Sequence, residues 1–210
     1  MFLSCYGVVM DVKISSRPNW KFLSELRILY GPGVYGTPLE NTMRNKVIAV
    51  TVLIALCALY RVLPHPFNFT PVAAMGLFAG AMFDSKRLAL VVPLVAMLLS
   101  DLFIGLHETM LFVYLAMAIT AGIGMLLRQR RSVATIALAG VASSLQFFFI
   151  TNTGMWAVTD FYPHTWAGLV QCWVMGLPFL QHDLASTWLF SAVLFGGYAM
   201  LSRHYPQLQR

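Results

Sequence analysis

The feature that most constrains the fold is a succession of long apolar segments separated by short clusters of basic residues. Such segments match the roughly 20 apolar residues that a helix needs to cross a hydrocarbon core of about 30 Å. Charged residues make up 10% of the chain, against about 25% in a typical soluble domain. The sequence therefore predicts an all-α integral membrane protein with about six transmembrane helices. The expected helices cover residues 46–63, 71–83, 86–106, 109–127, 133–150 and 183–201.

The stretch Leu63–Phe83 combines an extended entry with a short helix. Pro64, Pro66 and Pro71 fix φ and disfavour helical geometry in the residue that precedes each of them. We expect Thr70 to cap a helix that begins at Pro71 and ends at Phe83. That helix would rise about 20 Å, which is less than the core is thick. Because extended backbone at membrane depth must face protein or a water-filled cavity, the stretch is a candidate site wall. An ordinary outer loop with a capped helix is the alternative.

Residues 1–42 differ in composition from the rest, because they mix basic residues with prolines and glycines and contain no apolar run of membrane length. We expect them to be an extension that is poorly ordered or precedes the native start at Met43. Residues 43–203 would then form one transmembrane domain and residues 204–210 a short cytoplasmic tail. Deleting residues 1–42 should leave membrane insertion intact.

The segment Trp166–Leu180 is apolar but too short for a typical span. It follows a polar, aromatic connector over residues 151–165 and contains the sequence Gly176-Leu-Pro178. We therefore expect a re-entrant or surface-lying helix that does not cross the membrane fully.

The basic residues indicate an orientation. The connections 105–108 and 151–165 contain no lysine or arginine, whereas four basic clusters precede, separate or follow the other spans, and the positive-inside rule places these clusters in the cytoplasm. Six spans with both termini cytoplasmic satisfy this rule, with Arg61 as the exception. The net charge of +6 is divided among these short clusters, so it is not a nucleic-acid signal. The clusters are Arg44 and Lys46; Lys86 and Arg87; Arg128, Arg130 and Arg131; and Arg203 and Arg210.

Asp101, in the sequence LLSD, is an ionisable residue within an apolar span. A charge there costs several kcal/mol unless it is paired, so such a residue is a functional hypothesis by default. Its expected partner is Arg61, near the same side of the membrane. A structural ion pair is one interpretation, and participation in a substrate or cation site is the other.

The candidate site is an outer cavity between the extended segment, the end of helix 86–106 and the aromatic connector. Polar groups of the first two elements would bind a small molecule, while rings of the connector would close the cavity; alternatively, those rings are interfacial anchors. The expected substrate-binding residues are Arg61, His65, Asn68, Asp101, Asn152, Trp156 and Tyr162.

The sequence lacks the motifs that metal binding, ATP hydrolysis and common enzyme mechanisms require. The histidines, aspartates and cysteines show no metal-ligand spacing, so we expect no metal and no cofactor. No phosphate-binding loop, HExxH or nucleophile–base motif occurs, which argues against an enzyme and against ATP hydrolysis by the chain itself.

Small residues four apart predict close helix packing. The pair Gly76 and Gly80 lies on the short helix. The other pairs are Ala118 and Gly122, Gly140 and Ser144, and Ala192 and Gly196.

Three runs carry a resemblance to known proteins: RVLPHPFNFTPVAAMGLFAGAMF, VVPLVAMLLSDLFIGLH, and FFFITNTGMWAV with the later YPHTWAGLVQCWVMGLPFLQHDL. Over about residues 44–200 the chain resembles a family of bacterial inner-membrane proteins described as a domain of unknown function and as transport proteins. In size, topology and short second helix, that family is similar to the substrate-binding S components of energy-coupling-factor vitamin transporters. Those proteins have six helices, cytoplasmic termini and an outer vitamin pocket.

The resemblance implies an S-component-like transport protein of the bacterial inner membrane that imports a vitamin or cofactor precursor. Its expected partners are the lipid bilayer, the small-molecule substrate and an energy-coupling module. A partner helix would dock on the helix face that carries Ala49, Ala55 and Ala58. The alternative is a non-transport membrane scaffold that organises partners. A closed, partly polar outer pocket would favour transport.

Overall fold

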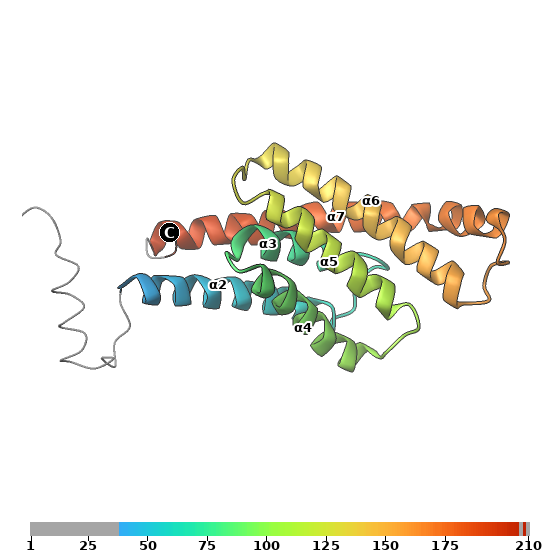
Figure 1. Ribbon diagram of the computed structural model, residues 1–210, viewed down its shortest axis with the longest axis horizontal. Coiled ribbons are helices and arrows are strands. Elements are labelled where there is room, and N and C mark those ends of the chain that lie inside the picture. Colours follow the sequence, from blue (N-terminus) through green and yellow to red (C-terminus); the bar gives the residue numbers. More distant parts are fainter. Residues whose placement is uncertain (1–37, 206–207, 209–210) are drawn as a thin grey trace, which may run out of the picture. The chain divides into compact units, whose positions relative to one another are not determined.

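The computed structural model describes residues 38–205 and Leu208, and the regular structure of this part is helical throughout. This confirms the all-α prediction. Residues 1–37 lie outside the described part of the chain, so the expectation about residues 1–42 stays a prediction there. The described part of α2 begins at Pro38, so Met43 lies inside a helix and not at its start. The helices are α2 (Pro38–Tyr60), α3 (Val72–Met82), α4 (Lys86–Ile104), α5 (Met110–Leu126), α6 (Val133–Val158) and α7 (Trp166–His204) (Figure 1).

Four of the described helices are long and apolar enough to cross a membrane, whereas α3 and α5 are shorter apolar helices. Many large apolar side chains on these helices are exposed, among them Phe103, Leu111 and Leu126. An exposed apolar surface of this extent is unfavourable in water and favourable against lipid. Length, composition and surface together indicate a membrane protein. The four candidate spans are Asn41–Tyr60, Lys86–Ile104, Val133–Val158 and Trp166–His204.

Helix α3 forms the centre of the bundle, because all of its residues are buried. It packs against α4, α5, α6 and α7, and most extensively against α5 (Figure 1). A Cβ atom on Gly80 would collide with the carbonyl oxygen of Ala121, and one on Gly76 would lie 2.9 Å from Met117 and Thr120. The predicted close packing at Gly76 and Gly80 is therefore confirmed.

The other small-residue pairs have mixed outcomes. Gly140 lies against Trp188, where a Cβ atom would come within 3.1 Å of the ring, so close packing at that pair is confirmed. Gly122 and Gly196 have no atom within 4 Å of an added Cβ, so the prediction was wrong at both. On α5 the close contact is made by Gly124, which is on the buried face of the helix.

The start of α3 differs from the prediction. Pro71 is the N-cap residue, Val72 is the first helical residue and no side chain caps the helix. The carbonyl of Pro71 accepts the first helical hydrogen bond, from the amide of Met75. The carbonyl of Thr70 accepts a bond from the hydroxyl of Ser186 on α7 instead, at 3.0 Å. Thr70 is thus bonded across the bundle and does not act as the cap.

Helix α6 continues to Val158, so much of the predicted connector 151–165 is helical. Polar side chains do not end the helix here because they bond to the carbonyls one turn earlier. Thr151 donates to Phe147 and Asn152 donates to Phe148, both at 2.8 Å. This pairing lets polar residues continue an apolar helix.

Helix α7 is continuous from Trp166 to His204, with Pro178 inside it. The expected re-entrant or surface-lying helix over 166–180 is therefore wrong, because that segment is the first part of a longer helix. Proline removes one backbone hydrogen bond of a helix, yet α7 continues through it and packs against α6. Trp173 Nε1 donates to Thr153 Oγ1 at 3.2 Å, and Cys172 Sγ donates to the carbonyl of Asn152 at 3.3 Å. With 39 residues, α7 rises about 58 Å, so it must be steeply tilted or project beyond a core of about 30 Å.

Basic residues from distant segments meet at one end of the bundle, here called the basic end. Lys46 Nζ lies 2.9 Å from Asp84 Oδ2. Arg128 donates to the carbonyls of Gly80 and Asp84, at 3.0 and 3.3 Å. Arg131 donates to the sulfur of Met82. The opposite end, here called the far end, carries the loops 61–71, 105–109 and 159–165.

This arrangement makes the orientation testable with single cysteines. We expect Glu108→Cys, in a far-end loop, to react with a membrane-impermeant thiol reagent added to intact cells. Arg130→Cys, at the basic end, should react only after the membrane is permeabilised. Both positions are exposed, whereas Cys57 and Cys172 are buried and should stay silent. Cys5 is replaced by serine in both variants. Labelling of Arg130→Cys in intact cells would reverse the orientation.

Candidate functional site

The expected pairing of Arg61 with Asp101 is confirmed. Arg61 Nη2 lies 2.8 Å from Asp101 Oδ1, and the Asp101 side chain is 1% exposed. The second carboxylate oxygen accepts a hydrogen bond from the hydroxyl of Tyr114 at 2.8 Å. Arg61 Nη1 donates to Ser100 Oγ at 2.6 Å. The residue that follows α2 is thus joined to α4 and α5 by one largely buried polar cluster, in which sequence reasoning missed Tyr114.

The first far-end cavity, here called the Arg61 pocket, has a volume of about 460 Å³. His65 borders it with its ring stacked on Tyr60, the centroids 5.6 Å apart, and its Nδ1 is 3.1 Å from the carbonyl of Pro66. Asp101 lies beneath Arg61 and does not line this cavity. The lining residues are Arg61, Val62, Leu63, Pro64, His65, Thr70, Phe103 and Ile104.

The second far-end cavity, here called the Asn152 pocket, lies between α6, α7 and the loops that contain Asn68 and Tyr162, and has a volume of about 280 Å³. It gathers three of the predicted residues from three separate segments. Its walls are otherwise mostly apolar, a composition typical of small-molecule sites. The lining residues are Phe67, Asn68, Asn152, Met155, Tyr162, Cys172, Met175, Gly176 and Phe179.

Local geometry positions the two amides of this pocket. Asn68 has φ 56°, a left-handed conformation that asparagine tolerates better than most residues. Asn152 Nδ2 donates to the carbonyl of Phe148. Its Oδ1 would lie 2.6 Å from a Cβ atom on Gly176, so the absence of a side chain at Gly176 lets the amide lie there.

Trp156 does not line either far-end cavity. Its Nε1 donates to the carbonyl of Pro163 at 2.9 Å, and its ring meets His164 edge to face. These contacts fasten the loop 159–165 to the end of α6. The structure therefore divides five of the seven predicted residues between two cavities, while Asp101 and Trp156 line neither of them.

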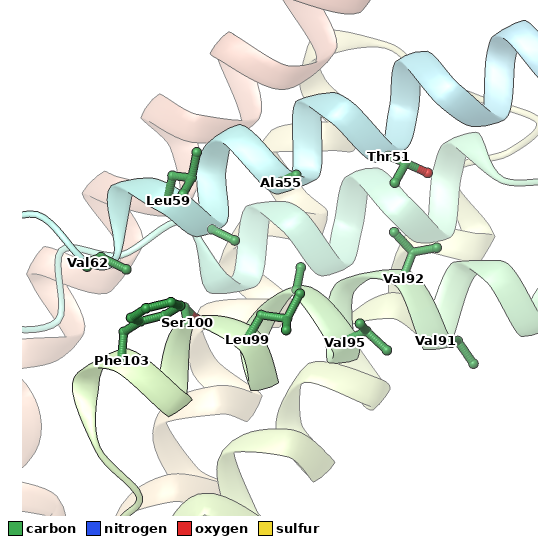
Figure 2. Close-up of a pocket in the computed structure, with 12 residues that line it drawn as sticks. Thr51, Ala55, Leu59, Val62, Val91, Val92, Val95, Leu99, Ser100 and Phe103 are labelled. Carbon is green, nitrogen blue, oxygen red and sulfur yellow. The ribbon is translucent and has the colours of Figure 1, made fainter.

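A third cavity is an apolar groove between α2 and α4, with a volume of about 420 Å³. Figure 2 shows side chains of the two helices facing each other across it, with Thr51, Ala55 and Leu59 on one wall and Val92, Leu99 and Phe103 on the other. Ala55 and Ala58 line the groove, whereas Ala49 packs against the core. Val62 and Phe103 are shared with the Arg61 pocket.

Residues 41–208 match the profile of DUF6580, described as a family of unknown function. The chain belongs to the DUF6580 family. The resemblance to an uncharacterised family is thereby confirmed, and every residue of the cavities above falls within the matched region. No curated protein and no solved structure matches the chain.

In this DUF6580 chain, sequence reasoning missed several walls of the Asn152 pocket. Met155 lies three residues after Asn152, and Cys172, Gly176 and Phe179 follow one another at helical spacing on α7. These spacings place each set on one helix face. The spacing of Met155 is hidden because the polar residues of 151–165 predict a connector. The three α7 residues lie within the predicted segment Trp166–Leu180, but its sequence does not indicate that their face meets Asn152 of α6.

Proposed function

We propose that this DUF6580 chain is an S-component-like membrane transport protein that binds a small molecule at its far end and moves it inward. The observation that supports this best is the Asn152 pocket, where amide and hydroxyl groups of Asn68, Asn152 and Tyr162 line an open and mostly apolar cavity. Ligand sites commonly combine apolar walls with a few polar groups that fix orientation. The far end faces outward if the basic end is cytoplasmic.

The proposed substrate is small and partly apolar, such as a vitamin or a cofactor precursor. A volume of about 280 Å³ is near the lower end of known ligand pockets. Because the sequence has no phosphate-binding loop, movement of the substrate would need an energy-coupling partner or an existing gradient. Uptake in a host without any coupling module would show that the chain works alone.

The binding proposal is tested by mass spectrometry of small molecules that co-purify with the protein in mild detergent. Asn68→Gly removes an amide while it keeps the left-handed backbone, and Asn152→Ala removes the other amide. We expect each variant to weaken ligand binding about tenfold, the loss of one or two hydrogen bonds. Leu126→Ala, at an exposed position of α5 outside the pocket, should leave binding unchanged. Undiminished binding by both stable amide variants would refute the site.

The second candidate function is a membrane scaffold that organises a partner, and the groove between α2 and α4 is the observation that favours it. Small side chains at Ala55 and Ala58 leave room for a helix to approach closely. A partner helix seated there should be displaced by Ala55→Phe. Val52→Phe adds similar bulk on an exposed part of α2 outside the groove, so it should retain the partner. Native mass spectrometry of both variants in detergent would compare the complexes.

A further inference from the structure

Buried hydroxyl and carboxyl groups form a polar seam where α6 meets α7. Each of its residues is at most 6% exposed, although both helices are apolar enough to span a membrane. The Oγ atoms of Ser144 and Thr187 lie 3.2 Å apart and join the two helices. The seam consists of Ser143, Ser144, Asp183, Ser186, Thr187 and Ser191.

Asp183 is the charged member of this seam, and it differs from the other buried carboxylate. Asp101 is paired with Arg61, and Asp84 at the basic end is paired with Lys46. Among the described residues, no salt bridge includes Asp183, and its Oδ2 has no hydrogen-bond partner. A carboxylate that is 6% exposed within a membrane helix is costly unless something compensates its charge.

Oxygen atoms of three residues lie around Asp183. The side chain of Ser144 on α6 neighbours its carboxyl group, and the Ser144 hydroxyl donates to Thr187 Oγ1 at 3.2 Å. The hydroxyl of Ser186 lies 2.9 Å from the backbone carbonyl of Asp183 and 3.0 Å from the carbonyl of Thr70. Thr70 is the last residue of the extended entry before α3. Carbonyls where a membrane helix is interrupted are a recurrent source of cation ligands.

The seam lies directly below the Asn152 pocket. Gly176 and Phe179 line that pocket, and Asp183 follows them at helical spacing on the same face of α7. The carboxylate is therefore one helical turn deeper in the bundle than the pocket floor.

We propose that Asp183 is the centre of a Na⁺ site, with ligands drawn from its carboxylate, the hydroxyls of Ser144 and Ser186 and the carbonyl of Thr70. The donors are all oxygen, which suits a hard cation. One negative charge is neutralised by one monovalent ion, whereas a divalent ion would leave a buried positive charge. The site is inferred from these contacts and does not require that the chain transports a substrate. Only its use to drive uptake rests on the proposed function.

The test measures thermal unfolding of the purified full-length protein in detergent, at constant ionic strength in NaCl, KCl or choline chloride. We expect Na⁺ to raise the midpoint by roughly 5–10 °C at about a hundred times its Kd. Asp183→Asn should abolish this response. Asp160→Asn, at an exposed loop position, should retain it. Because no substrate is present, failure of the transport proposal cannot mimic failure of the site.

If Asp183→Asn does not fold, Ser144→Ala provides the second test. It should raise the Na⁺ concentration for half the midpoint shift on the order of tenfold. Equal midpoints in the three salts would overturn the proposal. A midpoint that changes with pH and shows no preference for Na⁺ would also overturn it, because the carboxyl would then be compensated by a proton alone.

Discussion

Gly80→Ala is expected to lower the free energy of unfolding by about 2–3 kcal/mol, a large effect for the addition of one methyl group. The new Cβ atom would overlap the carbonyl oxygen of Ala121 and come within 2.8 Å of the backbone of Gly124. These are backbone atoms of a helix, so no side-chain rotation relieves the overlap. Helices α3 and α5 would have to move apart. That movement would disturb the packing of α3 on all sides, because every residue of α3 is buried.

The matched control is Gly122→Ala, on the same helix that Gly80 contacts. An added Cβ atom there meets nothing within 4 Å, and alanine is the better helix former by about 1 kcal/mol. We expect this variant to be as stable as the natural protein or slightly more stable. Unfolding in detergent, followed by circular dichroism, would compare the two. Equal stability of both variants would contradict the close contact of α3 with α5.

Asp101→Asn is expected to destabilise the fold by about 3–5 kcal/mol, the usual cost of breaking a buried ion pair. The substitution keeps the shape of the side chain but leaves the charge of Arg61 without its partner. Arg61 cannot readily reach water, because its side chain is 10% exposed. Tyr114→Phe removes only the hydrogen bond to the other carboxylate oxygen, so it should cost less, about 1.5–3 kcal/mol.

A double variant distinguishes the cost of leaving one charge unpaired from any further role of the two residues. Replacing both partners by apolar residues of similar size, as in Arg61→Met with Asp101→Leu, should restore most of the stability. If the pair is purely structural, ligand binding by that stable variant stays normal. If Arg61 also holds the ligand from its own pocket, binding falls while the fold survives. No recovery of stability in the double variant would show that the pair does more than balance charge.

The sequence alone was enough to predict the all-helical class, the clustering of basic loops and the pairing of Arg61 with Asp101. These follow from strong, local physical constraints. Apolar length determines which segments suit a membrane, and an ionisable residue at membrane depth needs a partner. With few charged residues in the spans, the choice of partner was narrow.

The tertiary structure decided the helix ends and the division of the candidate site. Thr151 and Asn152 are polar enough to suggest a connector, yet they bond to carbonyls of their own helix and α6 continues. Pro178 suggests a break, yet α7 continues through it and bonds to α6 on both sides, through Trp173 before the proline and Thr187 after it. Trp156 and Asn152 are close in sequence, but only Asn152 lines a cavity. Such outcomes depend on which neighbour faces each residue, and a single chain's local pattern does not contain that information.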